Sequence, residues 1–203
     1  MRARLTVVAF NLAVITFQLS AISRHPGAIK LPNTGMTLHL PTDITLLMGV
    51  ALCVAAMVSF IVSTAFDEQG SCTHWSLLAG DMFMYLGLAH SVSGFFAPSA
   101  KLLTPITLGV PAQALQWETV HLTVVVAGGA VWYLSVYVGP IVSLLRSPFG
   151  WRSTATIGIL YLVLLLATAH VTGQAVMLQR SIAGDSMASP PTLLDELAQP
   201  LRW

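Results

Sequence analysis

Residues 75–97 form an apolar run that is long enough to cross a lipid bilayer as one helix. A helix rises about 1.5 Å per residue, so about 20 residues span a hydrocarbon core of about 30 Å. Asp81 and His90 nevertheless lie inside this run. Ionisable groups within a membrane helix are rare and point to a functional hypothesis by default. The run therefore predicts a polytopic membrane protein with Asp81 and His90 as its first candidate functional residues.

Three glycines in the same run, Gly80, Gly87 and Gly94, recur every seven residues. Seven residues make about two helical turns, so the three lie within about 40° of one another on one face. A stripe of small residues lets another helix backbone come close, which is how membrane helices pack. His90 lies at the edge of this stripe, and we therefore expect it to face protein rather than lipid.

The composition assigns most of the chain to the bilayer. Of its 203 residues, 55% are hydrophobic and 8% are charged, whereas about 25% are charged in an average soluble domain. The net charge of +1 gives no reason to expect nucleic acid, and two cysteines are too few for a disulfide framework. The chain contains no nucleotide-binding fingerprint and no catalytic motif. We therefore expect a membrane protein without an enzyme activity of its own.

The apolar runs and the polar or proline-rich breaks between them predict an all-α bundle of about five transmembrane helices over residues 1–178. Four would remain if the first were a cleaved signal peptide, since it follows a short basic start. Residues 98–116 are interrupted by Pro105 and Pro111 and are expected to form an interfacial segment or a re-entrant turn. Residues 179–203 are expected to form a polar tail. The helices are expected at residues 5–22, 43–66, 75–97, 117–145 and 154–178.

The basic start of the first helix favours an N-terminus on the cytoplasmic side, and the expected location is the inner (plasma) membrane of a bacterium. With five crossings, the third and fifth helices run the same way. His90 and His170 each lie about four residues past the middle of their helix, hence about 6 Å beyond the midplane. His121 lies near the start of the antiparallel fourth helix. One side of the membrane should therefore hold five of the six histidines: His25, His39, His90, His121 and His170.

Several chemistries could use these histidines. His90 and His170 could hold the iron of a haem or the magnesium of a chlorin, with the glycines making room for the ring. His121, with Glu118 about one turn before it, and His39 could instead hold a transition metal nearer the membrane surface. A membrane histidine can also simply hydrogen-bond to a polar neighbour, and this structural interpretation competes with both.

A proton or ion path through Asp81, His90 and Glu118 is a further alternative. Asp81 and His90 are nine residues apart, which at about 100° per residue leaves them about half a turn apart. They point to opposite faces of their helix, so one straight channel cannot be lined by both. Asp81 could instead only anchor the start of the helix.

Small residues also mark the later helices. Gly128 lies on the His121 face of its helix, and Ala169 and Gly173 form a small-xxx-small pair in the last one. Such stripes are typical of helix–helix contacts in membranes, and together they exceed what one five-helix monomer obviously needs. The leading hypothesis is therefore a membrane subunit that packs in the lipid bilayer with other membrane protein subunits or with copies of itself.

Overall fold

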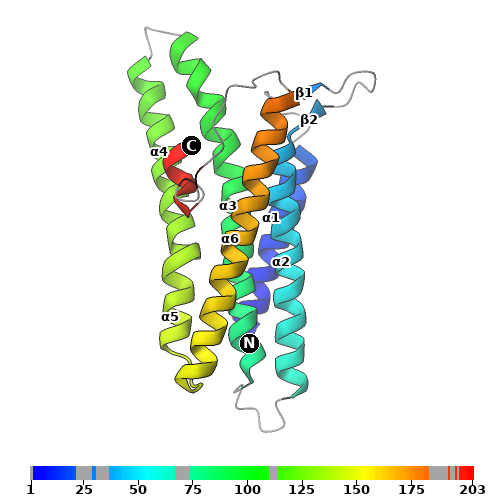
Figure 1. The fold of residues 1–203 in the computed structure, drawn as a ribbon. Coiled ribbons are helices and arrows are strands. Elements are labelled where there is room, and N and C mark those ends of the chain that lie inside the picture. Colours follow the sequence, from blue (N-terminus) through cyan, green and yellow to red (C-terminus); the bar gives the residue numbers. More distant parts are fainter. Residues whose placement is uncertain are drawn as a thin grey trace.

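The computed structural model is a bundle of long helices lying side by side (Figure 1). It describes residues 2–21, 29–30, 37–66, 74–109, 114–182, 192, 195 and 197–203. The long helices are α1 (Arg2–Ala21), α2 (Leu40–Ala65), α3 (Trp75–Gly109), α4 (Ala114–Tyr133) with its continuation α5 (Gly139–Leu145), and α6 (Trp151–Ile182).

The helices alternate in direction along the chain, as five crossings require (Figure 1). One end of the bundle carries a minimal antiparallel ladder of β1 (Ile29–Lys30) and β2 (Thr37–Leu38), in which Ile29 lies opposite Leu38. We call this end of the bundle the hairpin end. The chain begins at the opposite end, which we call the N-terminal end. The first turn of α2 and the last turn of α6 therefore meet at the hairpin end.

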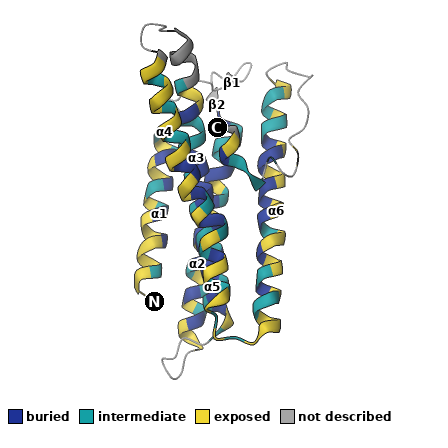
Figure 2. Ribbon diagram, turned by 90° about the vertical axis from the view of Figure 1, so that its left-hand side faces the viewer, coloured by how far each residue is buried: buried dark blue, intermediate teal, exposed yellow. Residues whose placement is uncertain are grey.

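Four helices are long and apolar enough to cross a membrane: Arg2–Ala21, Leu40–Ala65, Leu115–Leu145 and Trp151–Ile182. Helix α3 is not among them in the described part of the chain. It packs against every other long helix. Most of the exposed large apolar side chains belong to the surrounding helices, whose outer faces carry many exposed residues (Figure 2). An enclosed helix touches little lipid, so it can carry polar residues. The predicted all-α bundle of about five helices is confirmed.

The glycine stripe of α3 faces α2. Each glycine lies against an α2 side chain: Gly80 against Phe60, Gly87 against Cys53 and Gly94 against Leu46. A Cβ atom added at Gly80 would lie 2.5 Å from the Phe60 ring, closer than van der Waals contact allows. The missing side chains let the two helices approach, so this stripe is used inside the monomer.

The other predicted packing residues are also in contact with, or buried against, helices of the same chain. Gly128 of α4 lies against the side chain of Phe96 in α3. Ala169 and Gly173 are buried on the inner face of α6. Asn11 and Gln18 of α1 are buried as well, and the Asn11 amide donates to Cys53 Sγ at 3.1 Å.

Helix α3 continues past residue 97 to Gly109, so the predicted interfacial segment is wrong for residues 98–109. A proline removes one backbone N–H and strains one helical turn, but packing on either side can hold the helix together. Pro98 and Pro105 both lie within this helix, and Ala100 between them is fully buried. The remaining helix ends differ from the expected ones by about one turn or less.

The fourth membrane-crossing segment, α4 with α5, also stays helical across Pro140. Residues Leu134–Val138 form a π-helical turn, and α5 continues from Gly139 to Leu145. Pro140 has no N–H to give to the carbonyl of Val136, four residues earlier. The hydroxyl of Tyr161 in α6 donates to that carbonyl at 2.7 Å, so a side chain from another helix supplies a donor that Pro140 cannot.

The end of the chain returns to the bundle rather than forming a polar tail. The 3₁₀ helix η4 (Gln199–Arg202) packs against α4 and α3. The hydroxyl of Tyr137 donates to the carbonyl of Leu197 at 2.7 Å, and the Trp203 ring stacks on Phe96. Apolar side chains near the terminus explain this return, since they pack against the core of the bundle.

Candidate functional site

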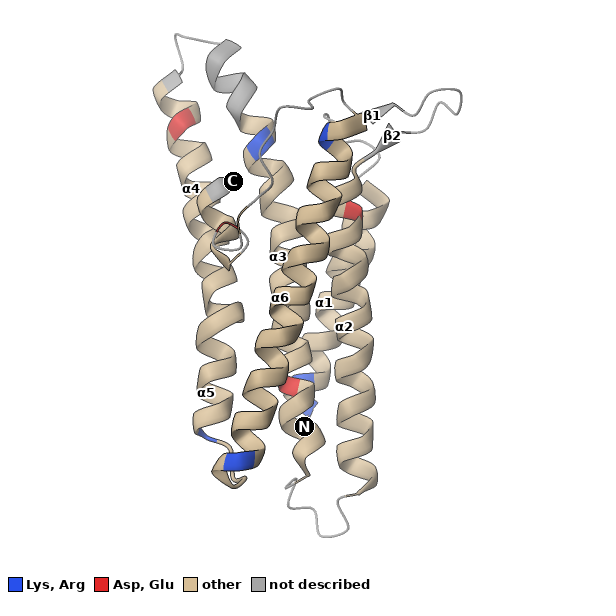
Figure 3. Ribbon diagram, in the orientation of Figure 1, with Lys and Arg blue, Asp and Glu red and all other residues tan. Residues whose placement is uncertain are grey.

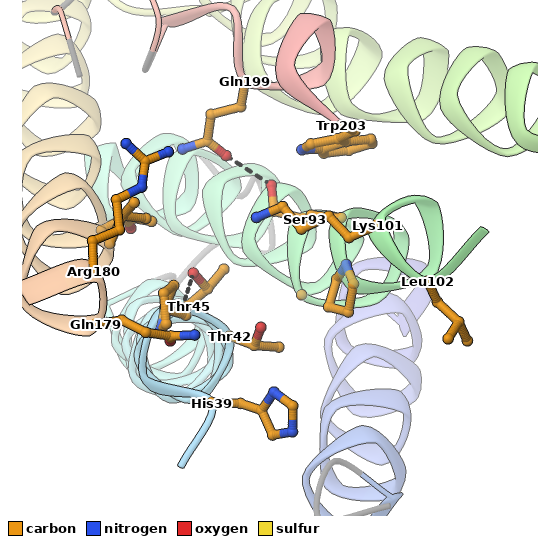
Figure 4. A pocket seen from close by; sticks show the side chains of 16 residues that line it. His39, Thr42, Thr45, Ser93, Lys101, Leu102, Gln179, Arg180, Gln199 and Trp203 are labelled. Carbon is orange, nitrogen blue, oxygen red and sulfur yellow. Dashed lines mark hydrogen bonds between the residues drawn. The ribbon is translucent and has the colours of Figure 1, made fainter. Parts of the chain in front are cut away.

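A cavity of about 440 Å³ lies at the hairpin end of the bundle (Figure 4). Its walls come from the first turns of α2, the second half of α3, the last turns of α6 and the terminal segment with η4. The size lies within the range of sites that bind small molecules, about 300–1,000 Å³. The return of the terminal segment is thus what closes one side of this cavity.

The charged residues that line the cavity are both cations, Lys101 from α3 and Arg180 from the last turn of α6. None of the described residues that line it is acidic. The N-terminus of α2 also meets the cavity through Thr42 and Thr45, and helix N-termini favour negative charge. The electrostatic character of the cavity is therefore positive.

Polar and apolar side chains line the cavity together with these cations (Figure 4). The Ser93 hydroxyl donates to Oε1 of Gln199 at 2.9 Å, which ties α3 to η4. Gln179 also lines the cavity, and its Oε1 is buried without a hydrogen-bond partner. Apolar surface comes from Leu102, Val176 and Trp203, among others. The cavity therefore offers charge, hydrogen bonds and apolar contact together.

The histidines predicted as ligands do not come together in one site. His39 is buried at the start of α2 and lines the cavity, whereas His90 lines a smaller cavity deeper in the bundle. His170 is exposed on α6, His121 is half-buried on α4, and Glu118 is exposed. His25 lies outside the described residues.

This arrangement does not bring the predicted haem or metal ligands together. His170 turns away from the bundle interior that holds His90, so the two imidazoles do not face one shared space for a ring. Among the described residues, no three His, Cys, Asp or Glu side chains are grouped as metal ligands would be. Helix parity sets depth but not direction around the helix axis, which explains the difference.

Asp81 is held in an ion pair with α1. Nε of Arg4 donates to Oδ1 at 2.5 Å and Nη2 donates to Oδ2 at 2.8 Å. Asp81 is 4% exposed, and it lies toward the N-terminal end, where Figure 3 shows an acidic residue of α3 beside basic residues. Glu118 lies near the start of α4, at the hairpin end. The proposed proton-path residues therefore do not line one cavity.

The sequence interpretation did not single out Lys101, Arg180 or Gln199. A signal for the two cations was present, because helix parity places both on the hairpin side of the membrane. No local signal marks Gln199, since its position depends on the return of the terminal segment.

No protein-family model, curated protein or solved structure matches this chain.

Proposed function

We propose that the chain is an integral membrane protein that binds an amphiphile with an anionic headgroup, a phosphate or a carboxylate, in the hairpin-end cavity. The observation that carries this proposal is the pair of cations, Lys101 and Arg180, in a cavity that has no acidic residue among its described lining. Lys and Arg are the usual partners of phosphate and carboxylate groups.

The position of the cavity supports an amphiphile. It lies where two candidate membrane spans, α2 and α6, reach one end, which is the depth of lipid headgroups in a membrane. Basic pockets between membrane helices at this depth bind anionic headgroups. The apolar wall made by Leu102, Val176 and Trp203 would meet the hydrocarbon part of the same ligand.

The buried Oε1 of Gln179 refines the ligand class. It is an acceptor without a hydrogen-bond partner, and an unpaired buried acceptor costs about 1–3 kcal/mol. A headgroup that carries a hydroxyl or amine beside its anionic group would supply the donor. A glycerol phosphate headgroup has this combination.

Native mass spectrometry of the purified protein tests the proposal with three probes: short-chain phosphatidylglycerol, short-chain phosphatidylcholine and inorganic phosphate. The test variant is Lys101→Gln/Arg180→Gln, and the matched control is Arg146→Gln/Arg152→Gln at the N-terminal end. Each interfacial cation contributes about 1 kcal/mol, so the test variant should bind phosphatidylglycerol about 30-fold more weakly. The control variant should bind like the wild type.

The probes separate the source of the anionic group. Preference for phosphatidylglycerol over inorganic phosphate indicates a lipid-derived ligand, and the reverse indicates a small anion from the aqueous phase. Equal binding of phosphatidylcholine and phosphatidylglycerol would contradict the proposal. So would a test variant that retains wild-type affinity for every probe.

The finer sequence-based hypotheses remain predictions. These are a subunit of a larger or homo-oligomeric complex, a haem or metal protein, an ion path, and a location in the bacterial inner membrane. The small residues that motivated the subunit hypothesis contact helices of the same chain. They therefore give no separate reason to expect a partner protein. Size measurement in mild detergent tests the subunit hypothesis directly.

If the N-terminus is cytoplasmic, the hairpin-end cavity lies in the outer leaflet.

A further inference from the structure

A second, much smaller cavity lies beneath the first, between α3, the π-helical turn, α6 and η4. Its volume is about 10 Å³, close to the smallest volume that holds one water molecule, about 10–15 Å³. Most of its wall is apolar, from residues such as Leu86, Trp132 and Leu165. Its polar lining comes from His90, Thr168 and Gln199.

His90 brings an unsatisfied group to this cavity. The residue is 6% exposed, and its Nε2 is buried without a hydrogen-bond partner among the described residues. A buried polar atom without a partner is rare in proteins, and bound water is a common remedy. The imidazole therefore indicates a ligand in the cavity rather than a packing role alone.

Two further groups complete a hydrogen-bonding set around the same space. The Thr168 hydroxyl donates to the carbonyl of Leu165 at 3.0 Å, which leaves its oxygen able to accept. Gln199 carries an amide with both donor and acceptor atoms. A buried water usually makes about three hydrogen bonds, which matches these three side chains.

Gln199 is also the one described residue that lines both cavities. Its hydrogen bond from Ser93 fixes the side chain between them. We propose that His90, Thr168 and Gln199 bind one water-sized hydrogen-bonding molecule, and that the Gln199 side chain separates this inner site from the outer cavity. This proposal does not depend on whether an anion binds in the outer cavity.

The first test is chemical access to His90. Diethyl pyrocarbonate acylates an imidazole nitrogen that it can reach, and peptide mass spectrometry identifies the histidine that reacts. The variants are Gln199→Ala, which removes the separating side chain, and Gln199→Met, which keeps its length without an amide. His74, half-buried at the N-terminal end, is the internal reference for reagent activity.

We expect His90 of the wild type and of Gln199→Met to react at least about tenfold more slowly than His90 of Gln199→Ala, since protection follows access. Rapid labelling of His90 in the wild type would overturn the proposal. An unchanged rate in a folded Gln199→Ala variant would overturn it as well.

The second test is a high-resolution experimental map of the wild-type protein and of Gln199→Met. We expect a single density peak at hydrogen-bond distance, about 2.7–3.2 Å, from His90 Nε2. The peak should weaken in the Met variant, which removes one of three partners. A map in which Nε2 contacts a protein donor or acceptor directly would refute the bound molecule.

Discussion

Removing Arg4 should destabilise the bundle through Asp81, which lies 77 residues away in the sequence. The Asp81 side chain is 6% exposed, and the Arg4 side chain is 38% exposed. Arg4→Gln leaves the carboxylate with a weaker partner in a place that water hardly reaches. Breaking a buried pair costs about 3–5 kcal/mol, and breaking an exposed one about 0.2–1 kcal/mol. With one partner buried and one half-exposed, we expect a loss of about 2 kcal/mol.

A double-mutant cycle isolates the pair from other effects of each change. Asp81→Asn removes the buried charge, so Arg4→Gln in that background should cost about 0.5 kcal/mol or less. Arg4→Lys keeps the charge but cannot form two parallel hydrogen bonds. Its free energy of unfolding should therefore lie between those of the wild type and Arg4→Gln.

Unfolding in mixed detergent micelles, followed by circular dichroism, measures these free energies. The variants need to be compared in one detergent, because the exposed part of Arg4 is solvated by it. If Arg4→Gln costs the same in the wild-type and Asp81→Asn backgrounds, the two residues are not coupled. The ion pair would then not explain how α3 carries an acid inside the bundle.

Three further predictions use other contacts. Tyr161→Phe should cost about 1 kcal/mol because it removes the side-chain hydrogen bond to the Val136 carbonyl, and Tyr133→Phe is its control in the same unfolding assay. Gly80→Ala should cost about 1–3 kcal/mol because its Cβ meets a buried ring, whereas Gly150→Ala, which meets nothing within 4 Å, should change stability by about 0.5 kcal/mol or less. Because His170 is exposed and His90 is buried, we expect the purified protein to show no Soret absorption band, and a stoichiometric band would support the bis-histidine haem hypothesis.

Much of the architecture follows from local sequence pattern. Apolar runs of bilayer length predict the helices, and their number predicts the alternation that brings Lys101 and Arg180 to one end. The glycine period of α3 predicts a close helix neighbour, although it does not say that the neighbour is α2. Prolines were poor predictors of helix ends, because Pro98, Pro105 and Pro140 lie inside continuous helical segments. Tyr161 donates a hydrogen bond next to Pro140.

Hydropathy and helix rise depend only on neighbours along the chain. The amino-acid pattern alone therefore predicts a helical membrane bundle and the end of the bundle toward which most of its ionisable residues lie. The side chains that contact one another are set by the folded arrangement of the helices. Arg4 and Asp81, or Gln199 and Ser93, come together through the order and rotation of helices around α3. That order is set by side-chain packing between segments far apart in sequence, where shape rather than periodicity selects the partner.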